Sequence, residues 1–463
     1  MPQVRLPLLS GVVSDATAEF LTSYPINLEV VATDNRIAQG QFRSPAGAIT
    51  RGTGPGIDRG GINWNGTLYR VMGDFLVSVS STGLAIPIGY IGGTGPVRFD
   101  EGFGRISIRS DGKLWYYNRD ELRQVTDPEL GNVVDAMWFD GYTLATDGTY
   151  LVVTELSDPY SVKPLKYGSA EEDPDPITGL IRVRGEAYAL GRYTIQVFQN
   201  EGGSGFPFVT NRGAMIPVGC VGPNAKCLFA DSFAFVGSAK NEALGIYLAG
   251  DGSATRISTR AIDDELAKVT NPADIVLEAR TYRAERRLLV HLPHKTLMWC
   301  LNATKALQQD VWQVLHSGRC EPYRLRNAVH CYGKMWVGDL NSTNIGELSE
   351  TVSTHFGDPA EWRCDVGLVY NDSTGLILNS VELVAATGRG QGEGSIFLSL
   401  TRDGMSFGRE RALRLAGRGA TRQRLIWRPR AIVRSIMGLR FRGYDATLPG
   451  LVACMADVEP LSR

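Results

Sequence analysis

The chain has 463 residues, 43% of them hydrophobic, and a formal net charge of −1. This length allows two or three domains with buried cores, and the balanced charge excludes a molecule whose whole surface attracts nucleic acid or anionic membrane. No stretch approaches the roughly 20 apolar residues of a membrane span. Because Pro7 and Gly11 interrupt the only apolar run near the start, we expect no secretory signal and no membrane insertion.

Residues 1–50 show no clear period and contain short extended pieces such as residues 26–33. A glycine-rich stretch, RGTGPGIDRGG from Arg51, follows them. We expect residues 1–50 to be an extended segment that packs on the domain beginning at residue 51.

A polar turn followed by a hydrophobic or aromatic strand occurs seven times between about residue 70 and residue 340. The copies are GDFLVSV from Gly73, DGKLWYY from Asp111, DGTYLVV from Asp147, RGEAYAL from Arg184, ADSFAFV from Ala230, AERRLLV from Ala284 and YGKMWVG from Tyr332. Such turns suit tight hairpins, and the following residues favour a buried, pleated surface. Successive turns lie about 36 to 54 residues apart, close to the length of a four-stranded propeller blade. The repeat predicts an all-β fold with a β-propeller-like domain of six or seven blades over residues 51–355; a large irregular β-sandwich is the alternative.

Helical patterns are few. The segments 263–269 and 303–315 are predicted to be short helical connectors between strands. The acidic segment 170–179, AEEDPDPITG, is expected to be exposed, because carboxylates so close together repel one another unless they are solvated.

The pattern of strands changes after about residue 358. Apolar segments that alternate with tight turns begin at Trp362, Gly375, Ser395, Ser435 and Leu451. About a hundred residues of this kind are typical of an antiparallel β-sandwich. We therefore predict a C-terminal β-sandwich domain over residues 356–463.

Arginine is concentrated in this second domain. Residues 402–442 contain twelve arginines, no lysine and only two acidic residues, Asp403 and Glu410. Arginine forms planar, bidentate pairs with carboxylate or phosphate and stacks on aromatic rings. The pattern favours an interface with an acidic protein surface or DNA phosphate; a solvated strand face, or internal carboxylate pairs, are the alternatives. The candidate interface residues are Arg422, Arg424, Arg428 and Arg430.

Catalytic and ligand-binding motifs are not found in the sequence. His291 and His294 are three apart, so that on a strand they point to opposite faces. The glycine-rich loops lack the Lys-Ser or Lys-Thr of a phosphate-binding loop, and the seven scattered cysteines are expected to be reduced thiols. We expect no catalytic, cofactor-binding or metal-binding residues, and no enzyme activity.

Eight segments, in the same order along nearly the whole chain, resemble the tail hub proteins, also called packaged DNA stabilisation proteins, of short-tailed podovirus-type phages. They are LPLLSG from Leu6, YPINLE from Tyr24, FRSPAG from Phe42, LYRVMGDFL from Leu68, FADSFAFVGSA from Phe229, RLLVHLPHKTLMW from Arg287, LTRDGMSFGRE from Leu400 and LIWRPRAIVRSIMGLRF from Leu425. None of these segments is a catalytic motif. The resemblance therefore depends on their number and order.

The resemblance implies a structural protein of the virion tail, assembled in the host cytoplasm as a homohexameric ring. Family members lengthen and close the channel beneath the portal and its adaptor ring, retain packaged DNA until genome ejection, and carry the tail needle and the tailspikes or fibres. The expected partners are further copies of this chain, the head-to-tail adaptor ring, the tail needle, a tailspike or tail fibre, and channel DNA bound without sequence specificity. A carbohydrate-active or carbohydrate-binding propeller protein is the alternative function.

Overall fold

The computed structural model forms two compact units. One contains residues 1–50, 294–324 and 348–463, and the other contains residues 51–293 and 325–347. The residues that the structure describes are 3–8, 13–15, 20–31, 41–102, 104–156, 158–169, 175–203, 205–250, 252–369, 375–388, 394–434, 436–447 and 450–461.

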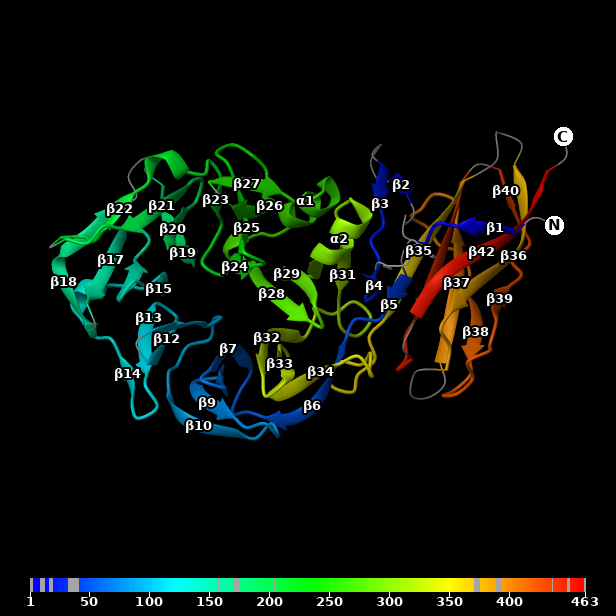
Figure 1. Cartoon of the computed structure of the whole chain (residues 1–463). Coiled ribbons are helices and arrows are strands. Elements are labelled where there is room, and N and C mark those ends of the chain that lie inside the picture. The colour runs from blue at the N-terminus through cyan, green and yellow to red at the C-terminus, as the bar shows by residue number, and fades with distance from the viewer. Residues whose placement is uncertain are drawn as a thin grey trace. The chain divides into compact units, whose positions relative to one another are not determined.

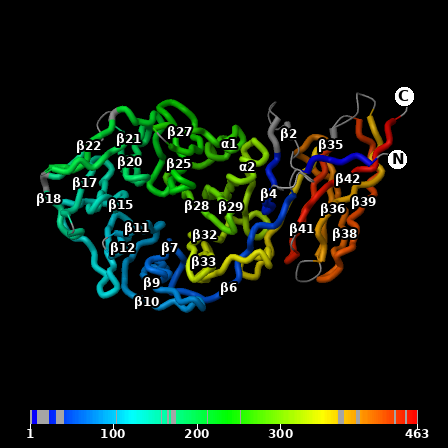
Figure 2. Tube along the Cα trace, in the orientation of Figure 1, coloured from blue at the N-terminus to red at the C-terminus, as the bar shows by residue number. Residues whose placement is uncertain are grey.

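The unit that begins at residue 51 contains seven successive groups of antiparallel strands, here numbered blades 1 to 7 (Figures 1 and 2). Blade 1 is β7 (Asp58–Trp64), β8 (Thr67–Met72), β9 (Phe75–Val79) and β10 (Ala85–Tyr90); blade 2 is β11 (Arg98–Gly102), β12 (Arg105–Ser110), β13 (Lys113–Tyr117) and β14 (Leu122–Gln124). Blade 3 is β15 (Asp135–Phe139), β16 (Tyr142–Thr146), β17 (Tyr150–Glu155) and β18 (Asp158–Ser169), with η1 (Pro128–Leu130) before it; blade 4 is β19 (Ile177–Val183), β20 (Glu186–Gly191), β21 (Ile195–Asn200) and β22 (Phe208–Thr210), followed by η2 (Arg212–Ala214). Blade 5 is β23 (Gly219–Cys220), β24 (Lys226–Phe229), β25 (Ser232–Ser238), β26 (Gly245–Gly250) and β27 (Ser253–Arg256); within this unit blade 6 contributes β28 (Val276–Tyr282) and β29 (Glu285–His291), and blade 7 contributes β32 (Leu325–Cys331), β33 (Lys334–Asp339) and β34 (Asn344–Ser349).

The blades close into a ring. The innermost strands lie next to one another in the order β7, β11, β15, β19, β24, β28 and β32, and β32 lies next to β7. Apolar side chains fill the space between neighbouring blades, as where Val71 and Leu76 of blade 1 pack with Ile106 and Ile108 of blade 2. This arrangement is a β-propeller, so the predicted fold class is confirmed, and the blade number is seven.

All seven predicted turns are tight hairpin turns, but they occupy two different places in a blade. In blades 1 to 3 the predicted turn joins the second strand to the third, as at Asp111, whose φ is +43°. In blades 4 to 7 it joins the innermost strand to the next, as at Arg184 and Tyr332, whose φ values are +51° and +54°. A tight turn at either place needs residues in the left-handed region.

The other unit contains two antiparallel sheets that form the β-sandwich. The larger has the order β39 (Leu425–Trp427), β36 (Leu376–Ala385), β42 (Gly450–Pro460), β5 (Gln41–Arg43) and β4 (Glu29–Val31), with β1 (Gln3–Leu6) paired to β42 and β40 (Ala431–Val433) paired to β36; the smaller has the order β35 (Trp362–Val369), β41 (Ile436–Gly443), β37 (Gly394–Thr401) and β38 (Arg411–Leu415). Trp427 and Phe441 meet in the core between the sheets, with ring centroids 5.6 Å apart. The predicted C-terminal sandwich is confirmed.

The first strands of the chain belong to this same unit. Leu6 of β1 is paired with Cys454 of β42, and Phe42 of β5 is paired with Leu451. The side-chain amide of Asn27 donates hydrogen bonds to the backbone oxygens of residues 316 and 361. The predicted domain limits near residues 50 and 355, and the packing of residues 1–50 on the propeller, stay predictions.

Helices are short and lie between strands. The helix α1 (Arg260–Ala267) and the turn η3 (Pro272–Asp274) precede β28, and α2 (Leu301–Leu307) lies between β30 (Thr296–Cys300) and β31 (Trp312–Leu315). The prediction of one helical connector over residues 303–315 was wrong in its second half. Gln308 adopts a left-handed conformation that ends α2, and the β-branched and aromatic residues after it form a strand.

Near the start of the chain, β2 (Val13–Asp15) pairs with β3 (Phe20–Thr22). The strand β6 (Gly47–Thr53) precedes the first strand of blade 1. The acidic residues 171–173, which were expected to be exposed, lie outside the described residues. In the described parts of the chain, no helix is long and apolar enough to cross a membrane.

Candidate interaction sites

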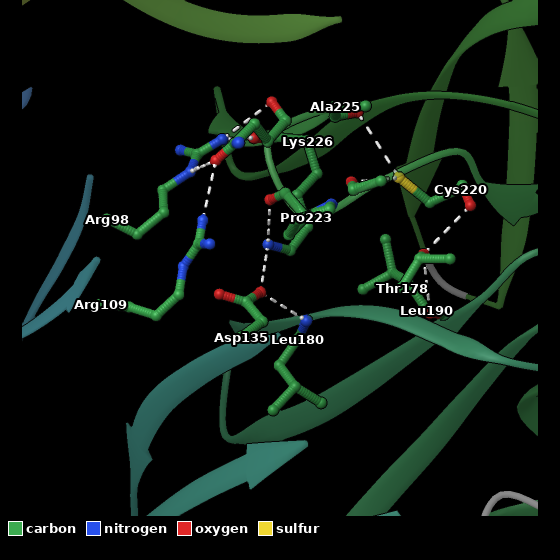
Figure 3. A network of polar contacts seen from close by, with 12 residues as sticks. Arg98, Arg109, Asp135, Thr178, Leu180, Leu190, Cys220, Pro223, Ala225 and Lys226 are labelled. Atoms are coloured by element: carbon green, nitrogen blue, oxygen red, sulfur yellow. Dashed lines mark hydrogen bonds and ion pairs between the residues drawn. The ribbon is translucent and has the colours of Figure 1, made fainter. Parts of the chain in front are cut away.

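Polar side chains of blades 2, 3 and 5 form one network inside the propeller (Figure 3). Arg98, on the innermost strand of blade 2, extends to blade 5 and donates through Nη2 to the backbone oxygens of Asn224 and Lys226, both at 2.9 Å. Its Nε donates to Asn224 Oδ1 at 3.1 Å, and Arg109 donates to the same oxygen. Blades 2 and 5 are not neighbours in the ring, so these bonds span the middle of the propeller.

A buried ion pair lies beside this bridge. Lys226 Nζ of blade 5 is 2.5 Å from Asp135 Oδ2 of blade 3, and both side chains are almost fully buried. Asp135 also accepts a hydrogen bond from the backbone nitrogen of Leu180 in blade 4, at 2.8 Å. Burial lowers the pKa of Lys226, whereas the nearby Asp135 carboxylate opposes that change.

A second bridge connects blade 4 to blade 2 through Arg182 and Asp100, 3.1 Å apart. Burial raises the pKa of Asp100, and the Arg182 charge offsets part of this effect. Together these contacts tie blades 2, 3, 4 and 5 to one another. At this level, side chains of blades that are not neighbours in the ring therefore meet across the middle of the propeller.

A separate network joins blade 1 to blades 6 and 7. Arg70 Nη1 is 2.5 Å from Asp58 Oδ1, and both side chains are fully buried. Asn327 of blade 7 donates to Asp58 Oδ2 at 2.7 Å and accepts a hydrogen bond from Arg70 through its backbone oxygen. The backbone nitrogen of Asn327 donates to Glu278 of blade 6 at 2.8 Å. This network ties blades 1, 6 and 7 together where the ring closes.

A cavity of about 470 Å³ lies next to the network formed by Arg70, Asp58 and Asn327. Its walls include Ile57, Pro96, Val276 and Leu340, and the polar side chain of His291 faces it. His291 is buried, with Nε2 3.4 Å from Glu278 Oε2. Among the described residues no group of three or more His, Cys, Asp or Glu side chains could hold a metal ion.

The pH dependence of stability should report on this histidine. Burial lowers the pKa of His291 to about 3, with Arg326 adding to the effect. Burial opposes ionisation of Glu278, but Arg280 and His291 outweigh it and hold the pKa of Glu278 well below its usual range. Between pH 6.5 and pH 3 the unfolded chain therefore binds more protons than the folded chain, and stability falls as the pH falls.

From this shift we expect the free energy of unfolding to fall by about 2 kcal/mol between pH 6.5 and pH 5 through His291 alone. His291→Gln, which keeps a hydrogen-bond donor but cannot titrate, should flatten the dependence in denaturant titrations at several pH values. His330→Gln, at an exposed histidine, is the control. Equal pH slopes for wild type and His291→Gln would contradict this assignment.

Eleven of the twelve arginines of residues 402–442 fall into two groups. Three of them form pairs with carboxylates inside the sandwich unit: Arg424 with Glu382, Arg440 with Asp365, and Arg442 with Glu410. Eight others are exposed and have no carboxylate partner among the described residues: Arg402, Arg409, Arg411, Arg418, Arg422, Arg428, Arg430 and Arg434. The alternative of internal carboxylate pairs therefore describes only a minority of these residues.

Most of the exposed arginines lie on or beside the edge strands of the two sheets: Arg411 is on β38, and Arg418, Arg422, Arg428, Arg430 and Arg434 are in the connections that follow β38, β39 and β40. The strand β38 ends the smaller sheet, while β39 and β40 each pair with β36 and with no other described strand. The two edges adjoin, since the Trp427 indole donates to the backbone oxygen of Arg411 at 2.9 Å. We call the set along these strands and their connections the arginine edge: Arg411, Arg418, Arg422, Arg424, Arg428, Arg430 and Arg434.

The four candidate interface residues all belong to the arginine edge and are all exposed. Arg424 is exposed although it makes two hydrogen bonds of 2.8 Å to Glu382. Arg428 and Arg430 flank Pro429 between β39 and β40, and Arg430 has a φ of +48°. Charge and proline on an edge strand also hinder edge-to-edge strand pairing. Their role as an interface stays a prediction.

The histidines and cysteines considered in the sequence do not form a common site among the described residues. His291 is buried in the propeller, whereas His294 is exposed. All seven cysteines are free thiols, and only Cys320 is exposed. The buried networks at Arg98, Lys226 and Arg70 were not predicted.

Solved structures with a similar fold have low overall likeness to the chain. The N-terminal domain of Nup159 has a TM-score of 0.41 and 11% identity, covering 71% of this chain and 99% of that chain. The WD40 domain of Neurospora crassa Pan2 has a TM-score of 0.40 and 11% identity, covering 66% of this chain and 96% of that chain.

Sequence relatives are far more informative. A family model described as the β-propeller of bacteriophage P22 Gp10 matches residues 4–353, and a model described as the β-sandwich of the same protein matches residues 361–459. The tail hub protein gp10 of Salmonella phage P22 is 26% identical, covering 99% of this chain and all of that protein. The resemblance found in the sequence is therefore confirmed, and the chain belongs to the bacteriophage P22 Gp10 family.

Proposed function

We propose that this chain is a protomer of a phage tail hub, a structural component of the virion tail. In this role it forms a homohexameric ring that extends and closes the channel below the portal and its adaptor ring, retains packaged DNA, and docks the tail needle and the tailspikes or fibres. The observation that carries the proposal is the match to the P22 tail hub protein over 99% of the chain. That relative is named as a tail hub and not as an enzyme, which supports a structural role.

The buried networks of the propeller support a rigid building block. Arg98 and Lys226 form hydrogen bonds and an ion pair with blades that are not their neighbours in the ring, and directional bonds of this kind favour one arrangement of the blades. An axis bridged in this way is not suited to DNA passage. We therefore infer that the DNA channel of the ring lies between protomers and not along the propeller axis.

Assembly on the adaptor ring tests this function. The purified protein, mixed with its adaptor ring, should form a complex of six-fold symmetry in electron-microscopy class averages, with six copies by mass. A monomer in the absence of the adaptor agrees with the proposal, because the adaptor supplies the template. No six-fold complex over a range of salt and protein concentrations would contradict it.

The four candidate arginines should matter for assembly more than for folding. Changing Arg422, Arg424, Arg428 and Arg430 to Ala removes exposed charges, and exposed ion pairs contribute little to stability. We expect ring formation on the adaptor to weaken, while the melting temperature of the protomer stays close to that of wild type.

The matched control removes the same number of positive charges elsewhere: Lys113, Lys240, Lys268 and Lys305, all exposed, are changed to Ala. This control should assemble like wild type. If the arginine variant loses as much melting temperature as it loses assembly, these residues hold the sandwich together and do not form an interface.

A further inference from the structure

The outer side of blade 3 carries an acidic surface with exposed aromatic rings. We call it the acidic tyrosine face: Asp127, Glu129, Asp147, Tyr150 and Tyr167. Tyr150 and Tyr167 lie on β17 and on β18, the last strand of the sheet, and are 47% and 41% exposed. Their ring centroids are 6.0 Å apart, so the two rings form one continuous patch.

The carboxylates of this face are close to the rings and lack cations. The Tyr167 hydroxyl donates to Glu129 Oε2 at 2.9 Å, and Asp147 Oδ1 accepts from the backbone nitrogen of Tyr150 at 2.8 Å. The hydrogen bond to Glu129 raises the pKa of Tyr167, and the charges of Asp147 and Asp127 act in the same direction. In the described part of the chain no Lys or Arg pairs with these three carboxylates. The face therefore presents three carboxylates that form no ion pair with a described residue.

The arginine edge has the opposite character. Arg422, Arg428 and Arg430 are exposed without a carboxylate partner among the described residues, so their guanidinium groups are available to pair with an acidic surface. Another arginine of the same unit, Arg440, shows which contacts a guanidinium group makes when a carboxylate and an aromatic ring are both within reach. Arg440 pairs with Asp365 through two hydrogen bonds of 2.8 Å and stacks 3.4 Å from the centre of the Phe407 ring.

An interface of carboxylates and aromatic rings satisfies both needs of a guanidinium group, ion pairing and stacking. Stacking of this kind also occurs on blade 3 itself, where Arg123 lies 4.3 Å from the centre of the Tyr160 ring. DNA phosphate would pair with the arginines but would leave Tyr150 and Tyr167 uncovered. The chain itself thus carries two complementary surfaces.

Resting on the proposed homomeric ring, we propose that the arginine edge of one copy binds the acidic tyrosine face of the neighbouring copy. A contact between two different surfaces is heterologous, and such contacts close into a ring when the rotation between copies allows it. Tyr150 and Tyr167 would become buried at the centre of this interface. The ion pairs around them would fix the position of one copy relative to the next.

Charge reversal with rescue tests this interface on the full chain. The first variant carries Arg422→Glu, Arg428→Glu and Arg430→Glu, and the second carries Glu129→Lys and Asp147→Lys. Each alone should raise the protein concentration for half-maximal ring formation on the adaptor by about tenfold or more. The combined variant, in which both surfaces are reversed, should return to within about threefold of wild type. Failure of the combined variant to improve on both parents would overturn the proposal.

The outcomes separate this interface from the proposed function. If wild type forms no six-fold complex, the tail hub function fails; if wild type assembles and rescue is absent, only the interface fails. Loss of DNA binding by the first variant with normal assembly would assign the arginine edge to phosphate and overturn the proposal.

Neutral variants provide a second test in case the charge-reversed chains do not fold. Glu129→Gln and Asp147→Asn keep the hydrogen-bond acceptors that serve Tyr167 and Tyr150 but remove the charges. If the reversed chains do not fold, this pair decides the question. Assembly that weakens, with unchanged melting temperature, supports the interface, and unchanged assembly overturns it.

Discussion

Lys226→Met is expected to lower the free energy of unfolding by about 3–5 kcal/mol, because it leaves a buried carboxylate without its cation. Asp135 is only 2% exposed, so water cannot replace the ammonium group. The substitution also removes the hydrogen bond of 2.9 Å from Lys226 Nζ to the backbone oxygen of Pro223. Denaturant titration, together with hydrogen exchange of the amides in β15 and β24, measures the loss.

A second substitution separates the charge from the packing. In Lys226→Met with Asp135→Asn the side-chain oxygen at position 135 can still accept from the Leu180 nitrogen, while the unpaired charge is gone. We expect this double variant to recover most of the lost stability. Lys240→Met, at an exposed lysine of the same blade, should be close to wild type. A single variant as stable as wild type would show that the pair adds nothing to the closure of the axis.

The fold class could be predicted because tight turns leave a local signal. Each of the seven predicted hairpins forms, with residues such as Asp111 and Tyr332 in the left-handed region. The blade register could not be predicted, because one blade contains more than one tight turn. Blades 1 and 3 have additional turns at Asn65–Gly66 and Asp140–Gly141, which the repeat did not include. The predicted spacing therefore mixed two positions and left the blade number open.

The buried polar networks had no comparable signal. Arg98 and Asn224 are 126 residues apart, and Asp58 and Asn327 are 269 apart. Such contacts depend on how the ring closes, which no short segment encodes. One local sign was present: Lys226 lies in the otherwise apolar strand KCLF, where a lone charge must either reach solvent or be paired.

The arginine edge could be predicted in part. The concentration of arginine was visible in the sequence, and so was its contrast with the almost neutral whole chain. Which arginines are paired internally was not visible, because Glu382 and Asp365 lie far from Arg424 and Arg440 in sequence. The acidic tyrosine face was not predicted either, since its residues come from η1 and the residue before it, the hairpin before β17, β17 itself, and β18.

Arg70→Met should be as damaging as the loss of Lys226, by about 3–5 kcal/mol, and its effect should appear where the ring closes. The guanidinium group bonds both Asp58 and the backbone oxygen of Asn327, so its loss removes a contact between blades 1 and 7. Burial raises the pKa of Asp58, and Arg70 opposes this effect, so the variant favours protonation of Asp58 in the folded chain. Part of the lost stability should therefore return as the pH is lowered.

Hydrogen exchange of the backbone amides shows which strands lose stability in Arg70→Met. Amides of β7 and β32 should lose protection more than those of β15 and β19, because only the first pair lies at the closing contact. Replacing both partners, with Arg70→Met and Asp58→Leu, should recover part of the stability but not the hydrogen bond to Asn327. Arg51→Met, which breaks a more exposed pair with Glu347, should cost no more than about 1 kcal/mol. Uniform loss of protection around the ring would show that Arg70 stabilises the whole propeller and not its closing contact.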